Sequence, residues 1–357
     1  MQRIAWLVRG DYRFLMGILI AVMVFCLSGC ASEDESSKES KAKAPVARRD
    51  KLFDVTFAHD QVAFAVGYPG ICLRSPNYGE SWERISIPTN EALYGVAFAD
   101  KNHGVIVGRQ GILLATSDSG GTWNKITVKK PGSDEPLAES LFAVAFGDNK
   151  HGIVVGSFGT ILRTEDGGQT WNSQFFEPMK SAAISSIFMF DANRGCLSGE
   201  YPSWEADMNE QVDKASLSNV FCTKDGGKTW NLVKTQSPYH LFSIRFVNDH
   251  EGWATGSKGT LLHTTDGGQT WSKVNTPTQF HLFDIKTAGN GLIIVGDGGT
   301  ILSYANGKFT PIAAGLYVWL MREAFADAKH GVAVGGRGAI LVTSDGGASW
   351  RQRGYVQ

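Results

Sequence analysis

The chain has 357 residues, of which 19% are charged, and its formal net charge is −1 at pH 7. This balance argues against nucleic acid as a partner, because surfaces that bind nucleic acid carry a basic stripe or patch. Of the five cysteines, Cys26 and Cys30 lie near the N-terminus, which leaves an odd number in the rest of the chain. An odd number argues against a disulfide framework as the main support of the fold.

The first 29 residues have the pattern of a secretory signal peptide. An apolar run covers residues 14–27 and follows arginines at positions 3, 9 and 13. The run is short for a membrane span, which needs about 20 residues, but it has the usual length of a signal sequence. We therefore assign residues 1–29 to a signal peptide that is removed from the mature protein.

The end of this segment, Leu27-Ser28-Gly29-Cys30, resembles the lipobox of bacterial lipoproteins. The resemblance implies that Cys30 is acylated, becomes the mature N-terminus and anchors the protein to a membrane. The alternative is an ordinary signal sequence in which the cysteine stands by chance. Ala31 follows Cys30, and by resemblance to enterobacterial sorting this favours the outer over the inner membrane. We expect a lipid-anchored protein of the bacterial cell envelope that faces the periplasm.

Residues 30–50 are expected to form a flexible tether between Cys30 and the folded domain. Residues 31–50 contain no aromatic residue and are rich in Glu, Ser, Lys and Ala. Such a composition cannot bury enough apolar surface to order itself. The domain would then stay close to the membrane, because a coil of this length averages roughly 25 Å end to end.

An octapeptide of the form Thr-x-Asp-x-Gly-x-Thr-Trp recurs through the rest of the chain. The copies end at Trp123, Trp171, Trp230, Trp271 and Trp350, and a weaker copy with Asn77 in place of aspartate ends at Trp82. Trp271 and Trp350 are separated by almost twice the usual spacing. The missing copy is recognisable between them as the frame of residues 283–309, in which Phe309 replaces the tryptophan. The chain therefore contains seven units of about 40 residues, which predicts a repeat architecture.

Each unit is expected to contain four short strands. The first has apolar residues at alternate positions, such as Phe242, Ile244 and Phe246, which is the period of a strand. Gly-x-x-Gly and Asp-Gly-Gly turns separate the later strands, and Asp-Gly between apolar runs favours a tight hairpin. Seven such units predict an all-β fold for residues 51–357, a seven-bladed β-propeller of four-stranded antiparallel blades with Asp-box hairpins. Cys196 and Cys222 face one another in unit four, and the sequence leaves open a disulfide or two buried thiols.

The octapeptide, or Asp box, is interpreted as structural. Its Thr and Asp side chains can bond nearby backbone N–H groups, and its tryptophan offers a large apolar surface for packing. Calcium binding is the alternative, but each box has a single carboxylate, whereas Ca²⁺ takes six to eight oxygen ligands. We expect no metal and no cofactor. The residues assigned to this structural role are Asp118, Asp166, Asp225, Asp266, Asp345, Trp82, Trp123, Trp171, Trp230, Trp271 and Trp350.

The Asp boxes and the Gly-x-x-Gly turns should lie on opposite faces of the propeller, because successive turns of an antiparallel blade alternate. Sequence varies most in the Gly-x-x-Gly turns, and unit four replaces this turn with an insertion of about residues 200–219. Exposed aromatic residues and arginines are typical of binding hot spots, although such loop residues can also be merely solvated. The predicted partner-binding residues on this face are Tyr68, Arg109, Phe158, Tyr201, Trp204, Lys258, Arg322 and Arg337.

The alternative to protein-partner binding is a propeller that binds glycans, or that cleaves them as a sialidase-like enzyme or another glycoside hydrolase. Sialidases also carry Asp boxes, but the segment Arg84-Ile85-Ser86-Ile87-Pro88 is not their Arg-Ile-Pro signature. Other propellers of this kind are glycosidases that use two carboxylates. Asp54 and Asp284 stand at matching positions of the innermost strands and are the candidate pair. The competing interpretation is that each carboxylate accepts hydrogen bonds from backbone N–H groups near the central channel.

The full unit resembles the repeat of the photosystem II stability and assembly factor family of plastids and cyanobacteria. Segments 155–171 and 255–271 carry the pattern Gly-x-x-Gly-x-x-x-x-Thr-x-Asp-Gly-Gly-x-Thr-Trp best, and the resemblance covers about residues 51–357. It implies a seven-bladed propeller without catalytic activity that binds a membrane protein during assembly, with an arginine patch in the partner site. We accordingly expect a monomeric, lipid-anchored scaffold that binds a membrane protein or protein complex of the envelope.

Overall fold

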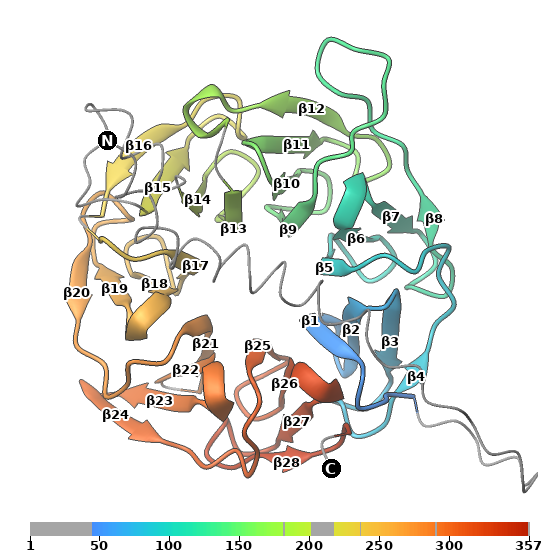
Figure 1. Cartoon of the computed structure of the whole chain (residues 1–357). Helices are drawn as coiled ribbons and strands as arrows, with labels where there is room; N and C mark the ends of the chain where they lie inside the picture. Colours follow the sequence, from blue (N-terminus) through green and yellow to red (C-terminus); the bar gives the residue numbers. More distant parts are fainter. Residues whose placement is uncertain (1–44, 181–182, 201–217, 236, 290, 356–357) are drawn as a thin grey trace, which may run out of the picture.

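The computed structural model shows seven four-stranded antiparallel sheets arranged in a ring around a central channel (Figure 1). The structure describes residues 45–180, 183–200, 218–235, 237–289 and 291–355. In every sheet the strands follow one another in chain order from the channel outwards. The prediction of a seven-bladed β-propeller is confirmed. No helix in the described part of the chain is long and apolar enough to cross a membrane.

The first four blades are built as follows. Blade 1 contains β1 (Lys51–His59), β2 (Val62–Tyr68), β3 (Ile71–Ser75) and β4 (Glu83–Arg84). Blade 2 contains β5 (Leu93–Phe98), β6 (Gly104–Gly108), β7 (Leu113–Thr116) and β8 (Asn124–Lys125). Blade 3 contains β9 (Leu141–Phe146), β10 (Gly152–Gly156), β11 (Thr160–Thr164) and β12 (Asn172–Phe175). Blade 4 contains β13 (Ala183–Met189), β14 (Gly195–Glu200), β15 (Ser218–Thr223) and β16 (Asn231–Lys234).

The last three blades repeat this order. Blade 5 contains β17 (Leu241–Phe246), β18 (Gly252–Gly256), β19 (Leu261–Thr264) and β20 (Ser272–Val274). Blade 6 contains β21 (Leu282–Ala288), β22 (Gly291–Gly296), β23 (Ile301–Ala305) and β24 (Lys308–Pro311). Blade 7 contains β25 (Leu320–Phe325), β26 (Gly331–Gly335), β27 (Ile340–Thr343) and β28 (Arg351–Gln352). Short 3₁₀ turns are η1 (Arg109–Gly111), η2 (Glu177–Met179), η3 (Ser257–Gly259), η4 (Asp297–Gly299) and η5 (Gly336–Gly338).

The Asp boxes join each blade to the one before it. In blade 3, Asp166 accepts hydrogen bonds from the backbone N–H of Thr170 at 2.9 Å and from its hydroxyl at 2.6 Å. The Trp171 indole then donates to the carbonyl of Gly168 at 3.0 Å. The ring packs in one cluster with Val105 of blade 2 and Val154 of its own blade. The box thus fixes its own hairpin and places a large apolar ring between two blades.

The two ends of the ring meet without exchange of strands. Blades 1 and 7 are each made from consecutive strands, so side chains and a short N-terminal segment close the ring. Val46 belongs to the cluster between these blades, and the backbone N–H of Gly338 donates to the carbonyl of Asp50 at 2.7 Å. Residues 45–50, assigned to the flexible tether from the sequence, are therefore part of the folded domain.

The two faces of the propeller are distinguished by their turns. The Asp-box turns bond to the turns between the first and second strands, as when Gly167 N–H donates to Lys150 O at 2.8 Å. The Gly-x-x-Gly turns bond instead to the links between blades, as when Gly336 N–H donates to Trp319 O at 3.0 Å. We call the face that carries the Gly-x-x-Gly turns the top face and the face that carries the Asp-box turns the bottom face. The expected separation of the two kinds of turn is confirmed.

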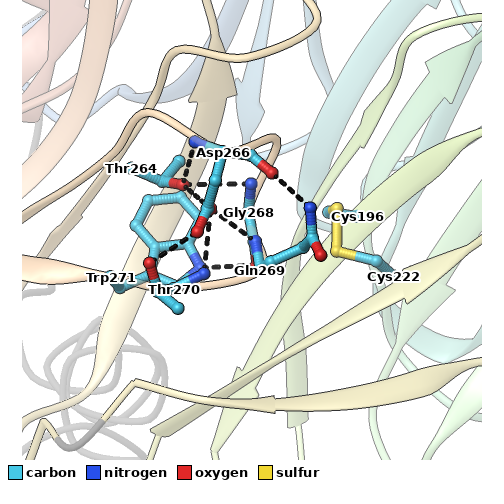
Figure 2. The surroundings of a disulfide bond; sticks show 8 residues. All are labelled: Cys196, Cys222, Thr264, Asp266, Gly268, Gln269, Thr270 and Trp271. Carbon is cyan, nitrogen blue, oxygen red and sulfur yellow. Dashed lines mark hydrogen bonds between the residues drawn. A yellow bond between two sulfur atoms is a disulfide. The ribbon is translucent and has the colours of Figure 1, made fainter.

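Cys196 and Cys222 form a disulfide between opposite residues of β14 and β15 (Figure 2). The sequence had left this pair open between a disulfide and two thiols. The Asp box of blade 5 lies beside it, and a Cβ added at Gly268 would stand 3.7 Å from the Cys196 sulfur. Cys72 is the free cysteine of the described residues, and burial raises the pKa of its thiol to about 12.

Candidate functional site

A cavity of about 400 Å³ opens on the top face where blades 6, 7 and 1 meet. Four basic residues and two aromatic residues dominate its lining, and we call it the basic cavity: Arg48, Arg49, Lys51, Arg337, Tyr317 and Trp319. Asp297 is the acidic residue of the lining. The side chains of Arg48, Arg49 and Arg337 make no hydrogen bond or ion pair with any described residue, and all three are exposed. An anionic group could therefore enter without displacing an existing partner.

The position of Arg337 follows from the geometry of its turn. Arg337 has a φ of 54°, in the left-handed region, and projects from η5 between two glycines. Gly338 has a φ of 65°, and a Cβ there would lie 2.5 Å from Val46, so a glycine is required. The turn is held on one side by Trp319 O and on the other by Asp50 O. The segment that carries Arg48 and Arg49 is thereby fixed beside Arg337.

The same turn presents a different side chain in each blade. The residue at the Arg337 position is Gln110, Phe158, Lys258 and Gly298 in blades 2, 3, 5 and 6, each with a φ between 53° and 63°. This conformation costs free energy for a residue with a side chain, yet the fold repeats it around the top rim. The framework of the turn is constant and its exposed residue varies, as expected for a face that specifies a partner.

Aromatic rings extend from the basic cavity along the rim of the channel. Trp319 stacks on Phe53 with centroids 5.9 Å apart and planes at 5°. Phe53 contacts Tyr94 at 5.5 Å, and Tyr94 contacts Phe142 at 5.7 Å. Tyr317, beside Trp319, is 77% exposed. Rings of this kind contribute contact area at interfaces with little loss of side-chain entropy.

The other predicted partner-binding residues are spread around the top face. Arg109 forms an ion pair with Glu91 at 3.7 Å, and Phe158 is 57% exposed. Lys258 lies over the Tyr239 ring at 5.2 Å, and Tyr68 is half-buried at the end of β2. Of the predicted residues that the structure describes, only Arg337 lines the basic cavity. Tyr201 and Trp204 lie outside the described residues.

Arg322 is placed differently from the expectation. Its side chain is only 14% exposed, donates to the carbonyl of Phe283 at 2.8 Å and lies 3.9 Å from the carboxylate of Asp284. It faces the channel from β25 and does not contribute to an exposed arginine patch. The arginines that do gather on the top face, Arg48 and Arg49, had been assigned to the tether. The pair Pro45-Val46 at the end of that polar segment was the available signal that the chain begins to pack there.

Asp54 and Asp284 lie on innermost strands, and both carboxylates already have hydrogen-bond or ion-pair partners. The Asp54 carboxylate accepts hydrogen bonds from the backbone N–H groups of Val55 at 2.9 Å and Val96 at 2.8 Å. Burial raises its pKa, against the opposing charge of Arg322. Asp284 is completely buried, pairs with the ammonium of Lys286 and accepts the Ser243 hydroxyl at 2.5 Å. Although burial alone would raise its pKa, Lys286 and the nearby arginines hold the pKa well below its usual range.

Asp284 therefore lacks the arrangement expected of a glycosidase acid. A general acid needs a raised pKa and access to the substrate, and Asp284 has neither. Asp54 accepts hydrogen bonds from backbone N–H groups, as in the competing interpretation from the sequence, whereas Asp284 is paired with the side chains of Lys286 and Ser243. Within the described part of the chain there is also no group of three or more His, Cys, Asp or Glu side chains that could hold a metal ion.

Glu323 is a carboxylate at a position that is apolar in the other blades. It is completely buried, and neither carboxylate oxygen has a hydrogen-bond partner among the described residues. The corresponding positions of the other six innermost strands carry valine or isoleucine, namely Val55, Val96, Val144, Ile187, Ile244 and Ile285. Burial, followed by the charge of Asp284, raises the pKa of Glu323 well above its usual value. A neutral carboxyl at this position is therefore favoured in the folded state.

We expect the stability of the wild type to fall as pH rises, and we predict that Glu323→Gln abolishes this fall. Between the unfolded pKa of about 4.3 and the higher folded pKa, the native state binds more protons than the unfolded state, so stability falls by up to about 1.4 kcal/mol per pH unit. Urea unfolding at pH 5 and pH 7.5 measures this slope. The variant should gain relative stability at pH 7.5, and parallel profiles for the two proteins would contradict the prediction.

Comparisons with known proteins agree with this architecture. The family model described as "Photosynthesis system II assembly factor YCF48" matches residues 75–135, 133–202 and 214–290, together more than half of the chain. Among curated proteins, no sequence matches this chain.

Several solved structures share the fold. A structure titled "YCF48 bound to D1 peptide" is 18% identical, with a TM-score of 0.66 over 84% of this chain and 93% of that one. YCF48 from Cyanidioschyzon merolae is also 18% identical, with a TM-score of 0.64 over 84% and 96% of the two chains. A GH74 xyloglucanase from Xanthomonas campestris is 13% identical, with a TM-score of 0.64 over 87% of this chain and 55% of that chain. At these identities the structures show a common fold alone.

Proposed function

Since the chain belongs to the family of the photosystem II assembly factor YCF48, we propose that it is a non-enzymatic scaffold that binds a segment of a membrane protein on its top face during assembly of a membrane complex. The observation that carries the proposal is the basic cavity, in which Arg48, Arg49 and Arg337 have no partner within the described chain. A relative of the same fold has been solved with a D1 peptide bound.

The chemistry of the basic cavity favours an extended peptide with a carboxylate. Guanidinium groups bind carboxylates through paired, charge-assisted hydrogen bonds. Tyr317 and Trp319 lie beside these groups and offer apolar surface to a neighbouring side chain. A volume of about 400 Å³ accommodates a few residues, so we infer that an acidic or C-terminal segment occupies it. The aromatic rim from Phe53 to Phe142 would support the rest of the segment.

The proposal includes attachment to a membrane through Cys30. Its support is the lipobox-like sequence around Cys30 and the polar segment that follows. The described fold begins at residue 45, and its first residues line the basic cavity on the top face. An anchor at Cys30 would therefore bring the chain to the membrane beside the binding face. We place the protein in the bacterial cell envelope, facing the periplasm.

We predict that charge reversal in the basic cavity weakens peptide binding. Arg337→Glu should reduce affinity for a fluorescein-labelled peptide of alternating Glu and Leu by about 30-fold, the effect of a hot-spot residue of about 2 kcal/mol. Fluorescence anisotropy measures the affinity, and an amidated C-terminus tests the contribution of the terminal carboxylate.

Lys101→Glu is the matched control. Lys101 is exposed in the turn between β5 and β6 on the bottom face, so the same change of net charge is made far from the cavity. Binding should persist in this variant apart from a small, salt-dependent loss. Equal losses in the two variants would show that the peptide senses net charge only, and the assignment of the top face would then be wrong.

A further inference from the structure

Blade 6 departs from its neighbours at the bottom end of the channel. In blades 2, 3, 5 and 7 the innermost strand ends in a phenylalanine that packs on the glycine opposite it; in blade 2, a Cβ at Gly104 would lie 2.6 Å from the Phe98 ring. Blade 6 has Thr287 in place of the phenylalanine and Leu292 near the position of the glycine. It also lacks the box tryptophan that packs beside these phenylalanines elsewhere. In the space between blades 5 and 6, Tyr304 and Phe309 of blade 6 pack with Trp253 of blade 5 instead.

Trp253 fills only part of this space. It stands on β18, packs in one cluster with Leu292, and contacts the Tyr304 ring at 5.3 Å. A cavity of about 270 Å³ remains between blades 5 and 6. Its apolar walls come from Phe188, Phe246 and Trp253, and its polar groups are Arg245 and Lys286. This cavity, which we call the lower cavity, shares no lining residue with the basic cavity.

Two buried N–H groups at the lower cavity make no hydrogen bond with the described residues, although the Nη1 of Arg245 donates to the carbonyls of Ile187 and Ile244 at 3.4 Å. The Nε of Arg245 and the Nε1 of Trp253 are both buried without a hydrogen-bond partner among the described residues. The indole is 97% buried, since its exposed fraction is 3%. Buried donors are almost always paired in folded proteins, so these two N–H groups are available to an acceptor that enters the cavity.

The charges around the lower cavity leave an excess of positive charge. Asp284 pairs with Lys286 and lies 4.0 Å from Arg245 and 3.9 Å from Arg322, so one carboxylate faces three cations. Glu323, the other buried carboxyl of the cluster, is held neutral by burial, which raises its pKa. Asp54 interacts with Arg322 and Lys286, and burial raises the pKa of Asp54 and lowers the pKa of Lys286, so burial favours the neutral form of both while the two arginines stay charged. A second anion is therefore accommodated by the charge of this cluster.

We propose that the lower cavity binds a small carboxylic acid with an aromatic or branched aliphatic body, whose carboxylate accepts hydrogen bonds from Arg245 and Trp253 and whose body packs against Phe188 and Phe246. Its volume lies just below the roughly 300–1,000 Å³ of sites for drug-sized ligands, which restricts the body to about one ring. This site is independent of the proposed binding of a peptide on the top face.

The test is a titration with 3-phenylpropanoate, observed through the indole N–H resonance of Trp253 in ¹H–¹⁵N spectra of the intact domain. We expect saturable shifts of this resonance with a dissociation constant of about 1 mM or tighter, from the efficiency of small ligands. The neutral amide 3-phenylpropanamide should bind at least about tenfold more weakly, because it offers no charge to Arg245. Absence of a saturable shift, or equal affinity for acid and amide, would overturn the proposal.

Two variants locate the site. Arg245→Met keeps the apolar stem but removes the guanidinium, and Asp284 retains Lys286 and Arg322 as partners; it should weaken binding of the acid about tenfold and leave the amide unchanged. Thr287→Phe, at an exposed residue of the lining, should abolish binding of both probes by occupying the cavity. Arg337→Met in the basic cavity is the matched control and should bind as the wild type does. Wild-type binding in Thr287→Phe would place the acid elsewhere.

Discussion

Replacement of Trp171 by alanine is expected to lower the free energy of unfolding by about 3–5 kcal/mol, the usual cost of removing a buried aromatic ring. The indole is 9% exposed and packs between blades 2 and 3. The cavity left behind would lie between two sheets that meet through side chains, so it cannot close without moving a blade. Urea unfolding monitored by far-UV circular dichroism measures the loss. A loss below about 1 kcal/mol, the level of an ordinary substitution, would contradict the structural role of the box.

Phenylalanine substitutions separate the packing of the ring from its hydrogen bond. Trp171 donates to the Gly168 carbonyl at 3.0 Å, whereas the Nε1 of Trp123 in blade 2 is buried with no partner in the described chain. Trp171→Phe should therefore lose about 1 kcal/mol more than Trp123→Phe, the net value of one hydrogen bond. The two positions are matched in burial, at 9% and 5% exposure. Equal losses would mean that the hydrogen bond contributes nothing to the stability of the box.

The blade architecture could be predicted because the hydrogen bonds of the Asp box are made within its own hairpin. Thr164, Asp166 and Trp171 all bond to atoms a few residues away, so the sequence pattern contains the whole interaction. Blade 6 has lost the box, but its apolar strands and its turn were still sufficient to identify it as one of the seven units. The packing of Trp253 against blade 6 could not be predicted, because Trp253 lies on the neighbouring blade and contacts Tyr304 from far along the chain.

The candidate site was predictable only where it depends on the repeat. Arg337 occupies a recurrent turn whose exposed residue could be identified by its position in the unit. Arg48 and Arg49 belong to no repeat, and their place was missed because Val46 and Asp50 anchor their segment through contacts with blade 7. Arg322 was misplaced for a related reason. Its strand position alone does not show whether the side chain extends to the exposed rim or to the buried Asp284. The charges of blades 5 and 6 determine that it pairs with Asp284.

Asp284→Asn is expected to cost about 3–5 kcal/mol at neutral pH, the cost of removing one partner from a buried ion pair. Asp284 has no exposed surface and is the common partner of Lys286, Arg245 and Arg322. The amide is nearly isosteric and can still accept the Ser243 hydroxyl, so the loss reports the charge rather than the shape. Chemical unfolding at pH 7 measures it. Asp54→Asn is the matched comparison, because Asp54 is held by two backbone N–H groups and interacts with Arg322 without a direct ion pair, and it should cost less.

The dependence on pH distinguishes the lost ion pair from a general defect in packing. The pKa of Asp284 is lowered in the folded state, because Lys286 and the two arginines outweigh its burial. Its contribution to stability is therefore fully present above the unfolded pKa of about 3.9 and declines as pH falls toward the lower folded value. The difference in stability between wild type and Asp284→Asn should be constant from pH 5 to pH 7 and shrink below about pH 4. A difference that stays unchanged down to pH 3 would assign the loss to packing, because the charge of Asp284 would then contribute nothing to the stability of the channel.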